Sequence, residues 1–298
     1  MGHGSYTSAD WARLAASKGI TSTSHEKNLF KAHRLEPEFD PRFIAMRQSR
    51  DSEQHPASTP IILGLDVTGS MGYLAAEIAR KGLHETMMKL FSEKPVPDPQ
   101  ILFAAVGDCT DNAPLQVTQF ESDIRIAQQL LRLWLEGNGG DDAEDYELLW
   151  YFAAYHTSAD AWEKHGRKGF LFTIGDADCH TSLSRSDILT VFNEKSPKLK
   201  SAALAEAAGE KFHVFHIHIQ EKPNEPLPRK LSAMLPGRVL PIEKRRIQYL
   251  PELIVSVMML VAGVPRERVE IAWSEPAALV VRRALDYLVI ETDGEVSL

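Results

Sequence analysis

The chain has 298 residues, 44% of them hydrophobic and 25% charged, so it can bury a sizeable core and has the composition of a soluble globular protein. Its formal net charge is −8, which argues against a nucleic-acid binder because such proteins need a basic footprint. Two cysteines, Cys109 and Cys179, cannot build a disulfide framework and fit a reducing compartment.

The ends and the apolar stretches of the sequence give no sign of export or of a membrane anchor. The first ten residues lack a charged segment followed by an apolar core, so no signal peptide is predicted. The most apolar stretch, 253–264, is too short to span a bilayer. We therefore expect a cytoplasmic protein with no membrane partner.

Residues 1–57 do not have the pattern of a doubly wound sheet. Ser8 can cap a short helix that runs to Lys18. Beyond it the segment is polar, and prolines at positions 37, 41 and 56 interrupt it. Two interpretations remain open: an arm that packs on the surface of the following domain, or a separate element that docks a partner.

From residue 59 onward strands and helices alternate, which predicts an α/β fold: a doubly wound, mostly parallel central sheet flanked by helices. Apolar runs predict buried strands at 60–66, 101–107, 168–175, 212–219 and 238–241, and an edge strand at 117–120. Helical spacing predicts helices at 72–91, 122–135, 184–193, 199–208 and 247–263, and one that ends near residue 156. We place this domain at 58–264 and a C-terminal helical extension, with a helix at 277–288, at 265–298.

The first predicted strand ends in a cluster of oxygen ligands. Asp66, Thr68 and Ser70 follow the apolar run 61–65 at alternate positions and precede the predicted helix. In an open α/β sheet, ligands bind beyond the carboxyl ends of the strands, where this turn lies. One carboxylate and two hydroxyls suit a hard divalent cation such as Mg²⁺.

The run from Asp66 to Ser70 resembles the first loop of the metal-ion-dependent adhesion site of von Willebrand factor type A domains. The resemblance extends over about 59–263 and implies two further loops. Gly139-Gly140-Asp141-Asp142-Ala143-Glu144 is similar to the Gly-Gly-Gly-Asp-x-Pro-Glu loop of a bacterial and intracellular subgroup, with Asn138 and Ala143 as departures. On its own, this acidic run could equally stabilise the dipole of the helix that follows.

The third loop of the resemblance falls at Asp176, which follows the strand 168–175. The family implies that Asp66, Thr68, Ser70 and Asp141 bind Mg²⁺ or Mn²⁺, and that Asp176 acts through a bound water. Clustered carboxylates repel one another unless a cation or a proton intervenes, so the metal and the fold should be linked. Asp108 could border the site, and Asp142 and Asp178 are the alternates if the register differs.

The resemblance implies a divalent-metal-dependent protein–protein interaction module, an intracellular adaptor or assembly factor rather than an enzyme. In better-known adhesion sites a neutral Thr occupies the second loop, and the partner supplies a carboxylate to the ion. Asp141 would partly neutralise the ion here, so the metal should be held more tightly and a partner's acidic residue more weakly.

Other interpretations compete with this one. The strongest is a haloacid-dehalogenase-like phosphatase or phosphotransferase with Asp66 as nucleophile, although the position two residues on is Thr68 and not the usual Asp. A third is a von Willebrand A protein that binds RNA, which the acidity of the chain disfavours. His213, His216 and His218 suggest zinc, but in a strand His213 takes the opposite face. The two cysteines could lie near the metal as redox sensors, and inert thiols are the favoured interpretation.

Overall fold

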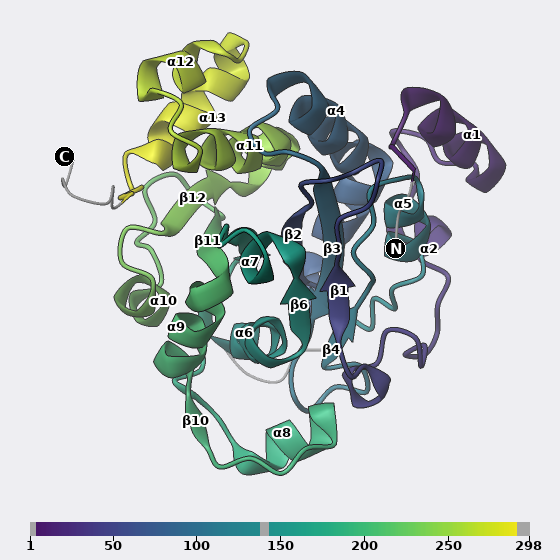
Figure 1. Ribbon diagram of the computed structural model, residues 1–298, viewed down its shortest axis with the longest axis vertical. Coiled ribbons are helices and arrows are strands. Elements are labelled where there is room, and N and C mark those ends of the chain that lie inside the picture. Colours follow the sequence, from purple (N-terminus) through teal and green to yellow (C-terminus); the bar gives the residue numbers. More distant parts are fainter. Residues whose placement is uncertain (1–3, 138–142, 291–298) are drawn as a thin grey trace.

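A computed structural model describes residues 4–137 and 143–290 of the chain. A six-stranded sheet in the order β12-β11-β7-β2-β3-β4 forms its centre, and only β4 runs antiparallel to its neighbour (Figure 1). The strands are β2 (Thr59–Asp66), β3 (Pro99–Val106), β4 (Leu115–Val117), β7 (Gly169–Gly175), β11 (Phe212–Gln220) and β12 (Val239–Glu243). The predicted α/β class with a mostly parallel sheet is confirmed.

The central strands are buried on both faces. Every residue of β2, β3 and β7 is buried, as expected for parallel strands covered by helices, which read as continuous apolar runs. Because β2 lies between β7 and β3, with Leu65 opposite Ile174 and Asp66 opposite Val106, the end of β2 emerges in the middle of the sheet edge.

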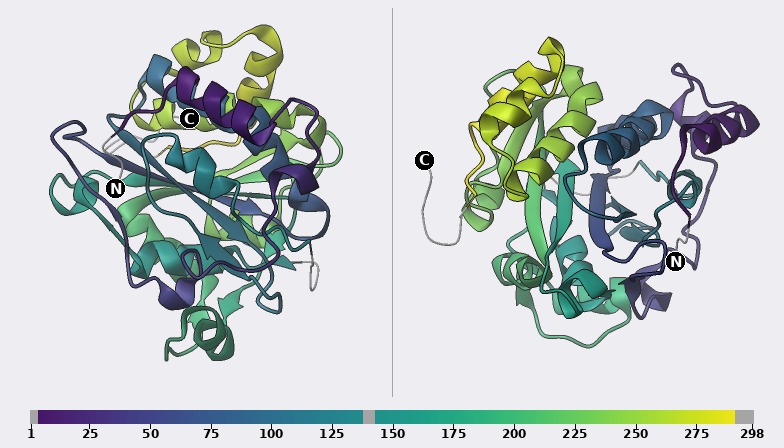
Figure 2. Two further views of the ribbon diagram at one scale, coloured as in Figure 1. Left: turned by 90° about the vertical axis from the view of Figure 1, so that its right-hand side faces the viewer. Right: turned by 45° about the horizontal axis from the view of Figure 1, so that its top comes forward.

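Helices cover both faces of the sheet, so that alternate residues of β2 enter two different cores (Figure 2). Ile61, Leu63 and Leu65 belong to one core and Ile62 to the other. The first core is closed by α3 (Gly72–Glu77), α4 (Leu83–Glu93), α5 (Arg125–Leu130), α11 (Leu250–Val261) and α13 (Glu275–Leu285). The second is closed by α6 (Tyr146–Tyr155), α8 (Arg185–Phe192), α9 (Ser201–Lys211) and α10 (Arg229–Met234).

Three predicted helices differ from those observed. A π-helical turn, Ile78–Gly82, separates α3 from α4 inside the predicted helix 72–91. The helix predicted over 122–135 is confined to α5, because the side-chain amide of Gln116 bonds the N–H and the carbonyl of Trp134 in place of helical partners. Residues 244–249 form a 3-10 helix before α11 instead of its first turns.

Several elements carry too little periodic signal to be predicted. One is α12 (Arg266–Ile271), in which only Val269 is buried. The short helices α2 (Glu26–Leu29), α7 (Asp160–Glu163) and α10 were not predicted either. Six strands of two or three residues also pair outside the main sheet: β1 (Arg47–Ser49) with β6 (Thr157–Ala159), β5 (Ala143–Glu144) with β8 (Asp178–Cys179), and β9 (Ser182–Leu183) with β10 (Leu199–Lys200). Within the described ranges no helix is both long and apolar enough to cross a membrane.

The N-terminal segment packs on the surface of the α/β domain. Its first helix, α1 (Ser8–Lys18), ends at Gly19 with φ 64°, and its N-cap is Thr7 rather than the predicted Ser8, since Thr7 accepts from the Asp10 N–H. Trp11 stacks on His84 of α4 with ring centroids 5.7 Å apart. Further along, Phe39 is fully buried, and the guanidinium of Arg132 lies 4.7 Å from its ring centroid.

Replacing Phe39 by Ala should lower the free energy of unfolding by about 3–5 kcal/mol, because it leaves a cavity under the arm. Denaturant unfolding monitored by circular dichroism would measure the change. Phe43, 69% exposed in the 3-10 helix Pro41–Phe43, offers a matched control, and Phe43→Ala should stay within about 0.5 kcal/mol of the wild type. Equal stabilities of the two variants would contradict a structural role for the arm.

Candidate metal centre

Asp66 is the most constrained residue at the carboxyl edge of the sheet. Its carboxylate is completely buried. Oδ1 accepts the backbone N–H of Thr68 at 2.9 Å and the Thr68 hydroxyl at 2.7 Å, and Oδ2 lies 3.4 Å from the hydroxyl of Tyr146 on α6. These donors hold the carboxylate in one orientation, and none of the described basic side chains pairs with it.

Glu144 joins this cluster, although the sequence did not identify it as a site residue. Its Oε1 lies 2.7 Å from Thr68 Oγ1, which is also 2.7 Å from Asp66 Oδ1. A hydroxyl has only one hydrogen to donate, so the contact with both oxygens requires a proton on one carboxyl group or a cation between them. Among the described residues, Glu144 Oε2 is buried without a hydrogen-bond partner, which leaves it available as a ligand.

Burial shifts the ionisation of these groups. It raises the pKa of Asp66 to about 7, against the opposing hydrogen bonds from Thr68, and the charge of Asp176 adds to the increase. Burial, and next the charge of Asp66, raise the pKa of Glu144 to about 8. The pKa of Asp176 is also raised by burial, and the nearby Lys244 opposes that shift.

Gly175 allows β7 to approach this cluster. A Cβ atom at that position would overlap the hydroxyl of Tyr146 and lie 2.8 Å from Asp66 Oδ2. Only glycine therefore lets the end of β7 deliver Asp176 while Tyr146 still reaches Asp66. Steric contact with Tyr146 and Asp66 therefore explains why the residue before Asp176 is glycine.

The structure brings together part of the predicted ligand set. Asp66 and Thr68 are in contact, and Asp176 is near enough for its charge to act on both Asp66 and Glu144. Ser70 lies in the 3-10 helix Gly69–Met71, and Asp141 falls outside the described residues. Within 4–137 and 143–290, no three His, Cys, Asp or Glu side chains are placed to hold a metal ion by themselves. A metal here needs hydroxyl ligands or the 138–142 loop as well.

The alternate carboxylates have other bonding partners. Asp178 accepts the backbone N–H groups of Lys230 and Leu231, each at 3.0 Å, at the start of α10. Asp108 accepts the N–H and the hydroxyl of Thr110, each at 2.7 Å. Asp108 borders the cluster, since its charge contributes to the raised pKa of Glu144. Asp142, like Asp141, lies outside the described residues.

The histidines and cysteines have the environment of core residues. His216 is fully buried with Nδ1 2.9 Å from Thr173 Oγ1, and burial lowers its pKa well below the usual value. Burial also lowers the pKa of His213, to about 4. For Cys109 and Cys179, burial raises the pKa of the thiol, so neither is the reactive thiolate at neutral pH.

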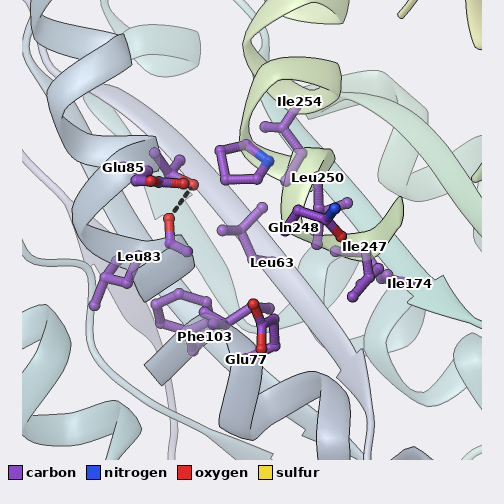
Figure 3. A pocket seen from close by; sticks show the side chains of 14 residues that line it. Leu63, Glu77, Leu83, Glu85, Phe103, Ile174, Ile247, Gln248, Leu250 and Ile254 are labelled. Carbon is purple, nitrogen blue, oxygen red and sulfur yellow. Dashed lines mark hydrogen bonds between the residues drawn. The ribbon is translucent and has the colours of Figure 1, made fainter. Parts of the chain in front are cut away.

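A small cavity lies between the sheet and the helices of the first core. Leu63, Phe103 and Ile174 from the sheet face Leu250 and Ile254 of α11, with Glu77 and Glu85 beside them (Figure 3). Its volume of about 20 Å³ accommodates roughly one water molecule. A space of this size is a packing gap and not a ligand site.

Comparison with known proteins finds similarity of shape only. No protein-family model and no curated protein matches the chain. The pilus adhesin SpaC from Lactobacillus rhamnosus GG is 9% identical, with a TM-score of 0.47 over 71% of this chain and 32% of its own. An aerotolerance-related membrane protein from Bacteroides fragilis NCTC 9343 is 12% identical, with a TM-score of 0.39 over 67% of this chain and 98% of its own.

A von Willebrand factor type A protein from Catenulispora acidiphila is 15% identical, with a TM-score of 0.36 over 70% of this chain and 42% of its own. The chain thus spans about a third of the adhesin and less than half of the Catenulispora protein. At these low identities and TM-scores, the likeness carries no statement about activity, ligand or partner.

In the presence of a chelator, the contribution of Asp66 and Glu144 to the free energy of unfolding should fall as the pH rises from about 4 to about 8. The carboxyl groups of Asp and Glu have pKa values of about 4 in the unfolded chain. In the folded protein the pKa is raised to about 7 for Asp66 and to about 8 for Glu144. These two groups therefore bind more protons in the folded than in the unfolded state across this window, and their titration favours unfolding as the pH rises. The buried histidines, whose pKa values are lowered, contribute with the opposite sign.

Glu144→Gln should weaken the downward dependence of the free energy of unfolding on pH, because it removes one of the two ionisations. Denaturant unfolding at several pH values would measure the slope, with the exposed Glu210 replaced by Gln as the control. If Glu144→Gln kept the full slope of the wild type, Glu144 would not be one of the groups responsible.

Proposed function

We propose that the chain is a von Willebrand A-type module that binds a protein partner through Mg²⁺ or Mn²⁺ at the carboxyl edge of its sheet. The ligands in this proposal are Asp66, Thr68, Ser70 and Asp141, with Asp176 acting through a water. The observation that carries the proposal is the Thr68 hydroxyl placed 2.7 Å from both Asp66 Oδ1 and Glu144 Oε1. One hydroxyl hydrogen cannot satisfy both carboxyl groups, so this buried cluster of oxygen atoms is suited to a cation.

The donor atoms favour Mg²⁺ or Mn²⁺ over zinc. Asp66, Thr68, Glu144 and Asp176 offer only oxygen, which hard cations prefer, whereas zinc sites in proteins use nitrogen and sulfur. The cation would supply positive charge that offsets the buried carboxylates and a coordination position for an external ligand. We add Glu144, which the sequence left out, to this ligand set because its buried Oε2 has no hydrogen-bond partner in the part of the chain that the structure describes.

The chain's own residues determine how strongly a partner's acidic residue can join. Asp66, Glu144 and Asp176 already surround the position, and Asp141 would add a further carboxylate. Each negative ligand weakens the attraction of the ion for another carboxylate. The proposed partner therefore needs contacts beyond the metal. A cytoplasmic adaptor or assembly role, with neither membrane nor nucleic acid as partner, remains part of the proposal.

Mg²⁺ or Mn²⁺ should raise the melting temperature of the wild type, measured against chelator. A cation at about 100 times its dissociation constant adds about 2.7 kcal/mol when it binds only the folded state. Asp66→Ala should abolish the response, while Glu210→Ala, which removes an exposed carboxylate elsewhere, should preserve it. Absence of any shift in the wild type would count against the metal site.

The phosphatase alternative predicts a different result. If Asp66 were a nucleophile, the wild type would hydrolyse 4-nitrophenyl phosphate with Mg²⁺ and Asp66→Ala would not. We expect no turnover that depends on Asp66, because its carboxylate is completely buried and its Oδ1 already accepts two hydrogen bonds. Release of 4-nitrophenol by the wild type but not by the variant would identify an enzyme.

A further inference from the structure

Next to the proposed metal centre, the carboxyl edge of the sheet carries a basic groove. It has a volume of about 280 Å³ and lies between the ends of β11 and β12 and the helix α13. Three guanidinium groups line it, from Arg245 and Arg246 after β12 and from Arg283 on α13. The net charge of the whole chain is −8, so a basic groove stands out from the rest of the surface.

The three arginines share a single carboxylate. Glu243, at the end of β12, meets Arg245 Nε at 2.6 Å, Arg246 Nε at 3.9 Å and a terminal nitrogen of Arg283. Burial opposes the ionisation of Glu243, but the hydrogen bond from Arg245 and the charges of the arginines hold its pKa below the usual value. One negative charge against three positive charges leaves the groove with a net positive charge.

The groove keeps donors for an additional anion. A guanidinium has five N–H donors, and Arg245 meets Glu243 through Nε while 69% of its side chain remains exposed. Arg246 is 29% exposed and lies 3.9 Å from Glu243. Arg283, at 30% exposure, bonds both Glu243 and Asn224, so it fixes α13 to the end of the sheet. Arg245 and Arg246 are therefore the residues to which an acidic ligand can bind without dismantling the fold.

Apart from Gln220 and Glu243, the remaining lining of the groove is apolar. Pro223, Pro241, Ile242 and Leu279 contribute to it, and Leu279 is 48% exposed. Pro241 lies in the edge strand β12 and has no N–H to offer an added strand. A bound segment would therefore be held by side-chain contacts rather than by extending the sheet.

Lys244 lies between the groove, whose lining includes its neighbours Glu243 and Arg245, and the metal loop. Its Nζ lies 5.0 Å from the ring centroid of Tyr73, the second residue of α3, and it pairs with Glu221. The charge of Lys244 also acts on Asp176. One extended ligand can therefore reach both the metal position and the groove.

We propose that this groove binds an acidic, partly apolar peptide segment of the protein partner, with carboxylates on Arg245 and Arg246 and an apolar side chain against Leu279. The inference rests on the proposed function, since it names the chemistry of the partner of that module. Charge complementarity selects an acidic ligand. Nucleic acid fits less well, because none of the described residues that line the groove is aromatic and able to stack a base.

The test is fluorescence anisotropy with a labelled peptide of glutamate and leucine, and with the same peptide carrying lysine for glutamate. The acidic peptide should bind the wild type, and the lysine peptide should not. Replacing Arg245 and Arg246 together by Gln should weaken binding about tenfold or more, because two charge-assisted hydrogen bonds are lost. The control, Arg185→Gln with Arg268→Gln, makes the same charge change at exposed sites elsewhere and should change the affinity by less than about twofold.

A second variant separates charge from folding. Arg245→Lys with Arg246→Lys keeps both charges and should recover part of the affinity, and melting curves would show that each variant is folded. Binding equal to that of the wild type in the folded Gln variant would overturn the proposal. So would the absence of any binding by the acidic peptide to the wild type.

Further arms distinguish other occupants and the metal. Single-stranded RNA that bound as well as the peptide, with the same loss in the Gln variant, would replace the peptide as ligand. Removal of residues 291–298, which include Glu291, Asp293 and Glu295, would overturn the proposal if it raised the peptide's affinity, because the chain's own tail would then be the occupant. In the presence of a chelator, peptide binding should still depend on Arg245 and Arg246. A failure of the groove proposal can therefore be told apart from a failure of the metal proposal.

Discussion

The burial of the Asp66 carboxylate is the constraint on which the surrounding structure depends. A buried carboxylate is costly unless hydrogen bonds or a cation compensate it. Thr68 meets part of this need from the same loop, and Tyr146 approaches from α6. To admit Tyr146, the end of β7 must be glycine, at Gly175. The Asp66 carboxylate at the end of β2 thus explains the tyrosine at the start of α6 and the glycine at the end of β7.

The sequence predicted the sheet well because its strands are buried on both faces. The runs at 60–66 and 168–175 matched β2 and β7 within a residue, since continuous apolar residues bounded by polar ones have few alternative interpretations. Helix lengths were less predictable. The spacing over 122–135 is helical, yet Gln116 bonds the backbone of Trp134, and such a tertiary contact leaves no trace in a local pattern.

The same distinction between local and distant contacts applies to the site. Asp66 and Thr68 could be paired from sequence because they are two residues apart and share a turn. Glu144 contacts Thr68 across a separation of 76 residues and is placed by β5, a strand of two residues that pairs with β8. The only signal available was its place in the run that begins at Gly139, whose resemblance to a known loop includes a Glu.

Because of the strand order, charged residues that are far apart in the sequence lie in a row along one edge of the sheet, basic at β12 and acidic towards β3. The ends of β12, β11, β7, β2 and β3 lie side by side, and they carry in turn the arginines after Glu243, the pair of Lys244 and Glu221, and then Asp176, Asp66 and Asp108. A partner that met this edge in the reverse orientation would place like charges together, which costs several kcal/mol. The proposed metal position alone would not fix the direction from which a carboxylate approaches. Together with the basic groove, it defines one direction in which an acidic segment can lie.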